Sequence, residues 1–106
     1  MKEWFKLNDR LPKTKEFFPA ETPEENKFDY YRSDPVVVYL DDEFIKRFST
    51  VRSNYIVARL EYYPNAIAEE GMPSYIFFGD SQFIEEIPVS AVLAWTTLPK
   101  KPNVLL

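Results

Sequence analysis

The sequence predicts one mainly β domain, built as a small twisted antiparallel sheet of four to five strands with one or two short helical turns. Three observations lead to this fold class. A chain of 106 residues has room for one domain. Aromatic residues make up 17% of it, and they suit the pleated, half-buried surface of a sheet. Glycine is scarce, so the many turns depend on Pro, Asp, Asn and Ser. An α+β fold is the alternative that the helical turns leave open.

The first third of the chain gives the weakest strand signal. Residues 13–34 are polar, contain Pro19 and Pro23, and include the charged run 21–27. A loop of this length in a small domain is either functional or partly mobile. Five aromatic residues within it indicate that parts of it pack against the rest of the protein. We therefore expect a long loop-like insert, tethered rather than free, within a single domain that spans residues 1–106.

The middle of the chain carries two clear strands. Residues 35–40 are apolar on both faces, which favours a central position in the sheet, and Pro35 fits as their first residue. Residues 54–63 alternate with period two, with the more polar face directed outward. Between them, residues 44–50 fit a short helix and a strand equally well, because their apolar positions match both spacings.

Three shorter strands are expected in the last third, at residues 74–78, 83–87 and 92–97. Single helical turns are expected at 66–70 and at 88–91, where Pro88 suits a first helical position. The apolar faces of these elements and of the middle strands should form the core together with both tryptophans. The residues expected to be buried are Trp4, Val36, Val38, Ile56, Leu60, Phe77, Leu93 and Trp95.

The residue types that the sequence lacks exclude most catalytic and cofactor chemistry. There is no His and no Cys, which excludes Ser-His-Asp and Cys-His catalysis and ordinary zinc, haem and iron–sulfur sites. With two glycines, neither a dinucleotide fingerprint nor a phosphate loop can be written. The run Asp41-Asp42-Glu43 lacks the spacing of a calcium loop and is interpreted as a solvated turn. We therefore expect no catalytic residue, no metal and no cofactor.

Charge is segregated along the chain, although the net charge is only −4. Residues 44–60 carry four bases and no acid, whereas residues 61–99 carry six acids and no base. The two segments either pair within the fold or leave an exposed acidic face that meets a partner protein with a basic surface. Direct nucleic-acid binding is not expected of an acidic chain. The candidate partner-binding residues are these six acids and two adjacent tyrosines: Glu61, Glu69, Glu70, Asp80, Glu85, Glu86, Tyr30 and Tyr31.

Composition also bears on location. The absence of cysteine is compatible with a reducing compartment. The first residues lack the apolar core of a signal peptide. The longest uncharged run, 87–99, is too short to span a bilayer and contains two prolines. We therefore expect a soluble protein of the cytoplasm that does not bind membranes.

Both ends of the chain resemble a known family. Residues 3–12 read Glu-Trp-Phe-Lys-Leu-Asn-Asp-Arg-Leu-Pro, which is similar to the opening E-W-x-x-x-x-D-R-L-P of a small bacterial and phage family. Residues 92–102 are similar to its closing V-T-H-W-x-P-L-P-x-x-P, and residues 36–39 and 57–63 resemble its first two strands. On these four ordered blocks, about a third of its length, the chain resembles the domain of unknown function 551 family.

The resemblance implies a short antiparallel sheet whose two Trp-Leu-Pro ends lie near each other, and a phage or prophage origin, but no activity. Ala94 stands where the family has His, and Thr97 where it has Pro, so any role of that His is absent here.

These observations lead to three hypotheses. The first is a non-catalytic protein-interaction domain, encoded by a phage or mobile element, that binds a host or phage protein, for example as an inhibitor or modulator. The alternative is a small-ligand or nucleotide-binding domain that uses aromatic side chains. A carboxylate-based, metal-dependent enzyme is a remote third.

Overall fold

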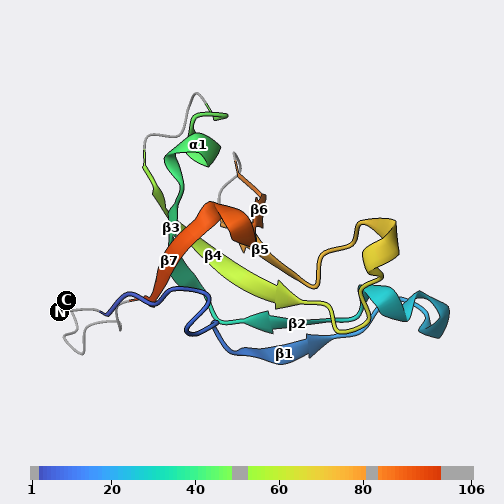
Figure 1. The fold of residues 1–106 in the computed structure, drawn as a ribbon. Helices are drawn as coiled ribbons and strands as arrows, with labels where there is room; N and C mark the ends of the chain where they lie inside the picture. Colours follow the sequence, from blue (N-terminus) through green and yellow to red (C-terminus); the bar gives the residue numbers. More distant parts are fainter. Residues whose placement is uncertain (1–2, 49–52, 81–83, 99–106) are drawn as a thin grey trace.

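A computed structural model describes residues 3–48, 53–80 and 84–98. The described residues form one curled antiparallel sheet, which confirms the mainly β fold class (Figure 1). The sheet has seven strands among these residues, more than the four to five expected. The strands are β1 (Thr14–Phe18), β2 (Tyr30–Ser33), β3 (Val36–Leu40), β4 (Tyr55–Tyr62), β5 (Tyr75–Gly79), β6 (Glu86–Pro88) and β7 (Val92–Thr97). The helices are α1 (Asp42–Ile45) and the 3-10 turns η1 (Pro23–Phe28), η2 (Ala68–Glu70) and η3 (Val89–Ala91).

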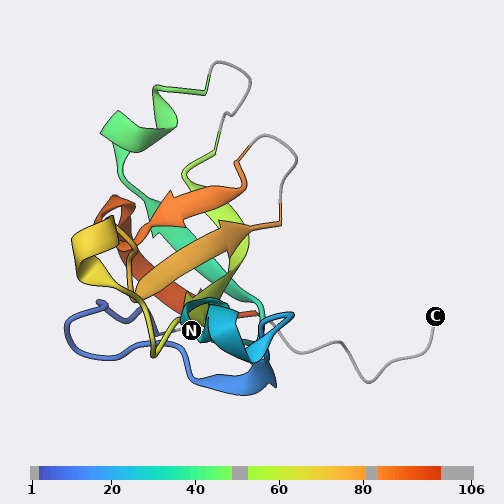
Figure 2. The same cartoon turned by 90° about the vertical axis from the view of Figure 1, so that its right-hand side faces the viewer.

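β4 is the centre of the sheet because it pairs with three other strands. One edge of β4 pairs with β3 over its first half and with β2 over its second half, and the other edge pairs with β5. β1 extends the sheet from β2, β7 extends it from β3, and β6 extends it from β5. Seen from the side, β5 and β6 lie across β3 and β7, so the curled sheet encloses its own apolar face (Figure 2).

The core lies inside this curl. Five of the eight expected core residues are buried: Val36, Val38, Leu60, Phe77 and Trp95. Ile56 packs against the core and is half-buried.

The expectation was wrong for two core residues. Trp4 is 42% exposed and Leu93 is 50% exposed. Phe5 packs on Trp95, and because neighbouring side chains of an extended segment point to opposite sides, Trp4 faces away from the core. Leu93 is the extra residue of a bulge, since Val92 pairs with Leu40 while Ala94 pairs with Tyr39.

The expectation of a long loop-like insert over residues 13–34 was also wrong, because this segment contains β1, η1 and β2. Its aromatic residues form cross-strand pairs, with Phe17 opposite Tyr31 and Phe18 opposite Tyr30. Such pairs stabilise an antiparallel ladder and offset the polar residues between them.

The remaining elements largely follow the sequence pattern. β3, β4, β5 and β7 lie where strands were expected, and η2 and η3 lie within the expected helical turns. The ambiguity over residues 44–50 is settled in favour of helix for Phe44 and Ile45, which close α1. Residues 49 and 50 fall outside the described part of the chain. The expected strand at 83–87 begins only at Glu86, and residue 83 is likewise outside the described part.

Candidate functional site

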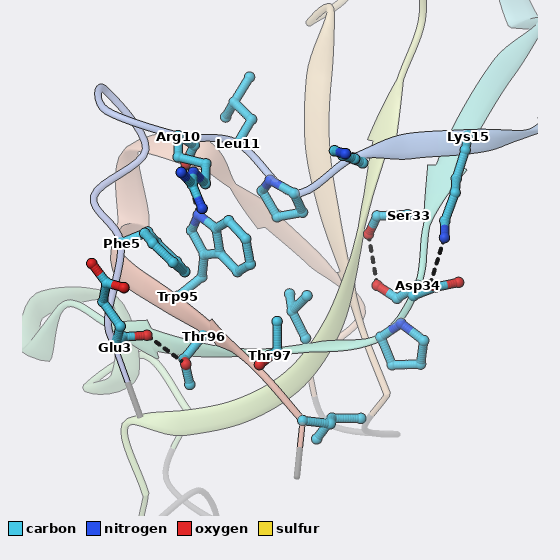
Figure 3. Close-up of a pocket in the computed structure, with 15 residues that line it drawn as sticks. Glu3, Phe5, Arg10, Leu11, Lys15, Ser33, Asp34, Trp95, Thr96 and Thr97 are labelled. Carbon is cyan, nitrogen blue, oxygen red and sulfur yellow. Dashed lines mark hydrogen bonds and ion pairs between the residues drawn. The ribbon is translucent and has the colours of Figure 1, made fainter. Parts of the chain in front are cut away.

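The candidate site lies at a break between two strands. β2 and β3 follow each other along one edge of β4, and Asp34-Pro35 separates them. The start of β1, at Thr14, and the end of β7, at Thr97, both reach this break. An open cavity of about 810 Å³ lies at this fork, and we call it the fork cavity (Figure 3). Its lining comes from within residues 3–15, 33–36 and 95–98.

The break itself is stabilised by a serine side chain. Pro35 has no N–H to give to a ladder. The Ser33 hydroxyl accepts a hydrogen bond from the Leu60 N–H (2.9 Å) and donates one to the Asp34 carbonyl (2.8 Å). Ser33 is 2% exposed, so its side chain satisfies a buried N–H of β4 at the point where the regular ladder ends.

Trp95 forms one wall of the fork cavity. Its indole N–H donates to the Arg10 carbonyl (2.8 Å), and its ring lies 4.9 Å from that of Phe5, measured between centroids. Phe5 and Trp95 also exchange two backbone hydrogen bonds, of 2.8 and 2.9 Å, and the Thr96 hydroxyl donates to the Glu3 carbonyl (2.7 Å). The N-terminal segment that contains Phe5 therefore lies beside β7, and the two Trp-containing parts of the sequence are adjacent, as expected.

Three basic side chains from the N-terminal part of the chain line the cavity, and all three are exposed: Arg10, Lys13 and Lys15. The guanidinium of Arg10 lies 4.6 Å from the centroid of the Phe5 ring. Lys15 is held by Asp34 on the opposite side of the cavity, with 3.2 Å between the amine and the carboxylate (Figure 3). Among the described residues, Arg10 and Lys13 have no ion pair.

The candidate residues Tyr30 and Glu61 come together on one face of the sheet. The Tyr63 hydroxyl donates to the Glu61 carboxylate (2.6 Å), and the Tyr30 ring lies between those of Phe18 (5.0 Å) and Tyr63 (5.3 Å). Burial raises the pKa of Glu61, while the Tyr63 hydrogen bond and the charge of Arg32 lower it. Burial and the bond to Glu61 raise the pKa of Tyr63.

Glu61 was expected on an exposed acidic face, and its burial shows that this placement was wrong. The residue is 9% exposed. It lies opposite Arg32 in the β2–β4 ladder, but the Arg32 guanidinium pairs with Glu16 at 3.0 Å. Glu61 is thus part of the packed sheet and not available to a partner.

Tyr31 lies on the other face of β2. Its ring is 4.9 Å from that of Phe17 and 6.3 Å from that of Tyr62, and Tyr62 continues the row to Tyr75 at 4.7 Å. These rings pack on one another across β1, β2, β4 and β5. Tyr30 and Tyr31 therefore serve two separate aromatic rows and do not form one surface.

The five other acids are exposed, but in two separate places. Glu69 and Glu70 lie in η2, where Glu70 pairs with Lys27 of η1 at 2.9 Å. With the η1 acids Glu24 and Glu25 they form what we call the acidic end. The remaining three, Asp80, Glu85 and Glu86, lie at the β5–β6 connection, far from η2 (Figure 1).

Pairing between the basic segment 44–60 and these acids is not seen in the described residues. The ion pair that involves an acid of the later segment joins Glu70 to Lys27, which lies outside 44–60. Lys46 pairs with Glu43 instead, at 3.0 Å. The first interpretation of the charge pattern is therefore not supported by the described part of the chain.

The acidic run Asp41-Asp42-Glu43 lies at the start of α1. Asp41 precedes α1, Asp42 accepts a hydrogen bond from the Asn54 side chain (2.7 Å), and Glu43 pairs with Lys46. Within the described ranges, no three acidic side chains gather as a metal site would require. No helix in these ranges is long and apolar enough to cross a membrane.

Comparison with known proteins adds no relative: no family model, curated protein or solved structure matches the chain. The candidate site therefore depends on its geometry.

Sequence reasoning missed the fork cavity, although a signal was present. The run Arg10-Leu11-Pro12 and the residues around Trp95, which stand out near the two ends of the sequence, both line the cavity.

Proposed function

We propose that this protein is a non-catalytic protein-interaction domain that contacts its partner at the fork cavity. The observation that carries the proposal is the composition of this opening. Half-buried Phe5 and Leu11 give it apolar surface, while exposed Arg10 and Lys13 line it without an ion pair among the described residues. Aromatic residues and arginine are the types enriched where proteins bind one another tightly.

The chemistry of the lining supports binding over catalysis. The one buried serine there, Ser33, donates its hydroxyl hydrogen to a carbonyl and has no base beside it. Lys15, a candidate base in the lining, is paired with Asp34. Neither His nor Cys occurs in the sequence to complete a nucleophilic pair.

The acidic end indicates the surface charge of the proposed partner. Four exposed carboxylates on η1 and η2 support a partner that carries a basic surface patch, because exposed charge of one sign steers the approach of the opposite sign. The four sequence blocks support membership of the domain of unknown function 551 family and a phage or mobile-element origin. A cytoplasmic location in a bacterial host belongs to the same proposal and is supported by the lack of cysteine.

A small-ligand binder is the second candidate, favoured by the size of the cavity. Its volume of about 810 Å³ lies within the range of small-molecule sites. Against it, Trp95 is 5% exposed and its ring already packs against Phe5, so this indole offers no free face for stacking. A thermal-shift screen against a metabolite panel tests this candidate. A rise in melting temperature that is lost when a residue beside Trp95 is substituted would favour it.

The main proposal is tested by capture from bacterial lysate with a matched pair of variants. The tagged protein should retain one protein in a stoichiometric complex, measured by native mass spectrometry. Lys13→Glu lies in the cavity lining and should lower the captured amount, whereas Lys6→Glu makes the same charge change on an exposed residue outside that lining and should not. Absence of any stoichiometric partner, or equal capture by both variants, would contradict protein binding at this site.

A further inference from the structure

The cationic groups of the fork cavity differ in how they are engaged. Asp34 neutralises Lys15 at 3.2 Å, so this pair contributes little net field. Arg10 and Lys13 are exposed, and neither has an ion pair within the described residues. Glu3 supplies the one other carboxylate of the lining. The cavity therefore carries a local excess of positive charge on a chain whose net charge is −4.

The aromatic surface of the cavity already holds its own cation. Arg10 lies over the Phe5 ring at 4.6 Å, which is the position that a basic ligand side chain would take. A basic ligand would have to displace Arg10 and would meet the charge of Lys13 as well. A carboxylate, by contrast, could pair with Arg10 while the guanidinium stays on the ring, because the two contacts use different parts of that group.

The apolar part of the lining requires more than a free anion. Leu11 and Phe5 are half-buried and Leu98 is 36% exposed, so they leave apolar surface at the cavity. Arg10 and Lys13 are too exposed to bind a single small anion tightly, since exposed pairs contribute little. A ligand that combines an apolar side chain with neighbouring carboxylates matches both parts of the lining.

We infer that the fork cavity binds an acidic segment of a partner protein, with an apolar side chain placed among Phe5, Leu11 and Leu98 and flanking carboxylates on Arg10 and Lys13. The inference rests on the proposed function and specifies the ligand of the same site. The ligand is a peptide segment rather than a nucleic acid, because it must carry an apolar side chain and carboxylates close together, and a peptide carries both.

The test is selection of random 12-residue peptides displayed on phage, followed by fluorescence anisotropy with the enriched peptide. We expect enrichment of Asp and Glu on both sides of one Leu, Phe or Trp. The Kd of the enriched peptide should rise roughly tenfold for Lys13→Glu, the loss expected when a contacting charge is reversed. Lys6→Glu, the matched control, should change it less than about twofold. Circular dichroism melts confirm that both variants fold.

Three results would overturn the inference. One is enrichment of neutral peptides, another is equal weakening by Lys13→Glu and Lys6→Glu, and the third is enrichment of Lys- and Arg-rich peptides. If binding of such basic peptides is lost in Glu69→Lys/Glu70→Lys and kept in Lys13→Glu, protein binding stands but occurs at the acidic end. If no peptide is enriched and no lysate protein is captured, both the inference and the proposed function fail.

Discussion

At the scale of single residues, the two tryptophans have opposite roles. Trp95 is 5% exposed, packs on Phe5 and donates its N–H to Arg10, whereas Trp4 is 42% exposed and lies 5.8 Å from the Tyr55 ring. Trp95→Ala should lower the free energy of unfolding by about 3–5 kcal/mol, because it leaves a cavity and an unpaired carbonyl. Urea denaturation followed by circular dichroism measures this loss.

Trp4→Ala is the matched control for this substitution, and it should cost less than about 1.5 kcal/mol because much of the ring stays in solvent in the folded protein. Similar losses for the two variants would contradict the different roles assigned to the rings. Sequence reasoning expected both tryptophans in the core. Composition cannot distinguish them, because only the pairing of Phe5 with Trp95 fixes which side of the opening segment faces inward.

The buried carboxyl of Glu61 gives stability a specific pH dependence. Burial raises its pKa above the ordinary 4.5, so the folded state holds this proton more tightly than the unfolded state. The free energy of unfolding should therefore fall as pH rises from 4.5 through the folded pKa. Glu61→Gln should remove this fall, so the variant should gain on the wild type between pH 4 and pH 7 in thermal melts.

Tyr63→Phe tests the same pair from the other side. It removes the donor whose 2.6 Å hydrogen bond favours the ionised carboxylate, so it should lower stability at pH 7 by about 1–3 kcal/mol. The loss should shrink at acidic pH, where the carboxyl is neutral in both proteins. A loss that is the same at both pH values would mean that the phenol contributes by packing alone.

At the scale of elements, the fork depends on how the chain manages one proline. Pro35 interrupts the path from β2 to β3, and the Ser33 hydroxyl takes the Leu60 N–H at 2.9 Å in place of a ladder bond. Ser33→Ala should lower the free energy of unfolding by about 1–3 kcal/mol, because a buried N–H loses its acceptor. Hydrogen exchange should speed up at the Leu60 amide in particular.

Ser90→Ala is the comparison for this variant, since Ser90 is exposed in η3 and should change stability by less than about 0.5 kcal/mol. If Ser33→Ala were equally mild and left exchange at Leu60 unchanged, the break would have to be stabilised in another way. The separation of β1 from β7, and with it the cavity, would then need a different explanation.

The success of sequence reasoning also varies with the element. Strands with apolar faces, such as β3 and β4, were predicted because burial imposes their pattern directly. β1 and β2 were missed because their stability comes from cross-strand pairs such as Phe17–Tyr31, and the partners are separated by a polar turn. The fork cavity could not be located from any one segment, because its lining comes from three segments that only the strand pairing brings together.

At the scale of the whole molecule, charge is distributed so that two surfaces have opposite local sign. The acidic end carries exposed carboxylates on η1 and η2, whereas the fork cavity carries Arg10 and Lys13. The net charge of −4 therefore repels an acidic peptide at long range, even though the cavity attracts it at close range. Association and dissociation rates should respond differently to a change made far from the cavity.

Glu69→Lys/Glu70→Lys makes that change. Each reversal adds two positive charges, so the pair takes the net charge from −4 to 0. Both residues are exposed, and the single ion pair lost, Glu70–Lys27, is a surface pair, so stability should change by less than about 1 kcal/mol. At about 10 mM salt the Debye length is about 30 Å, so charges act over a long range. The association rate of the selected acidic peptide should then rise about threefold. The dissociation rate should stay the same, because neither residue lines the cavity.

Stopped-flow fluorescence at several salt concentrations measures both the association rate and the dissociation rate. The gain in association rate should vanish near 0.5 M salt, where the long-range field is screened. An association rate that does not rise at low salt, or a rise that persists at 0.5 M salt, would contradict the predicted effect of net charge on the approach of the acidic peptide. A changed dissociation rate would mean that Glu69 or Glu70 touches the bound peptide, and the site would have to be moved from the fork to η2.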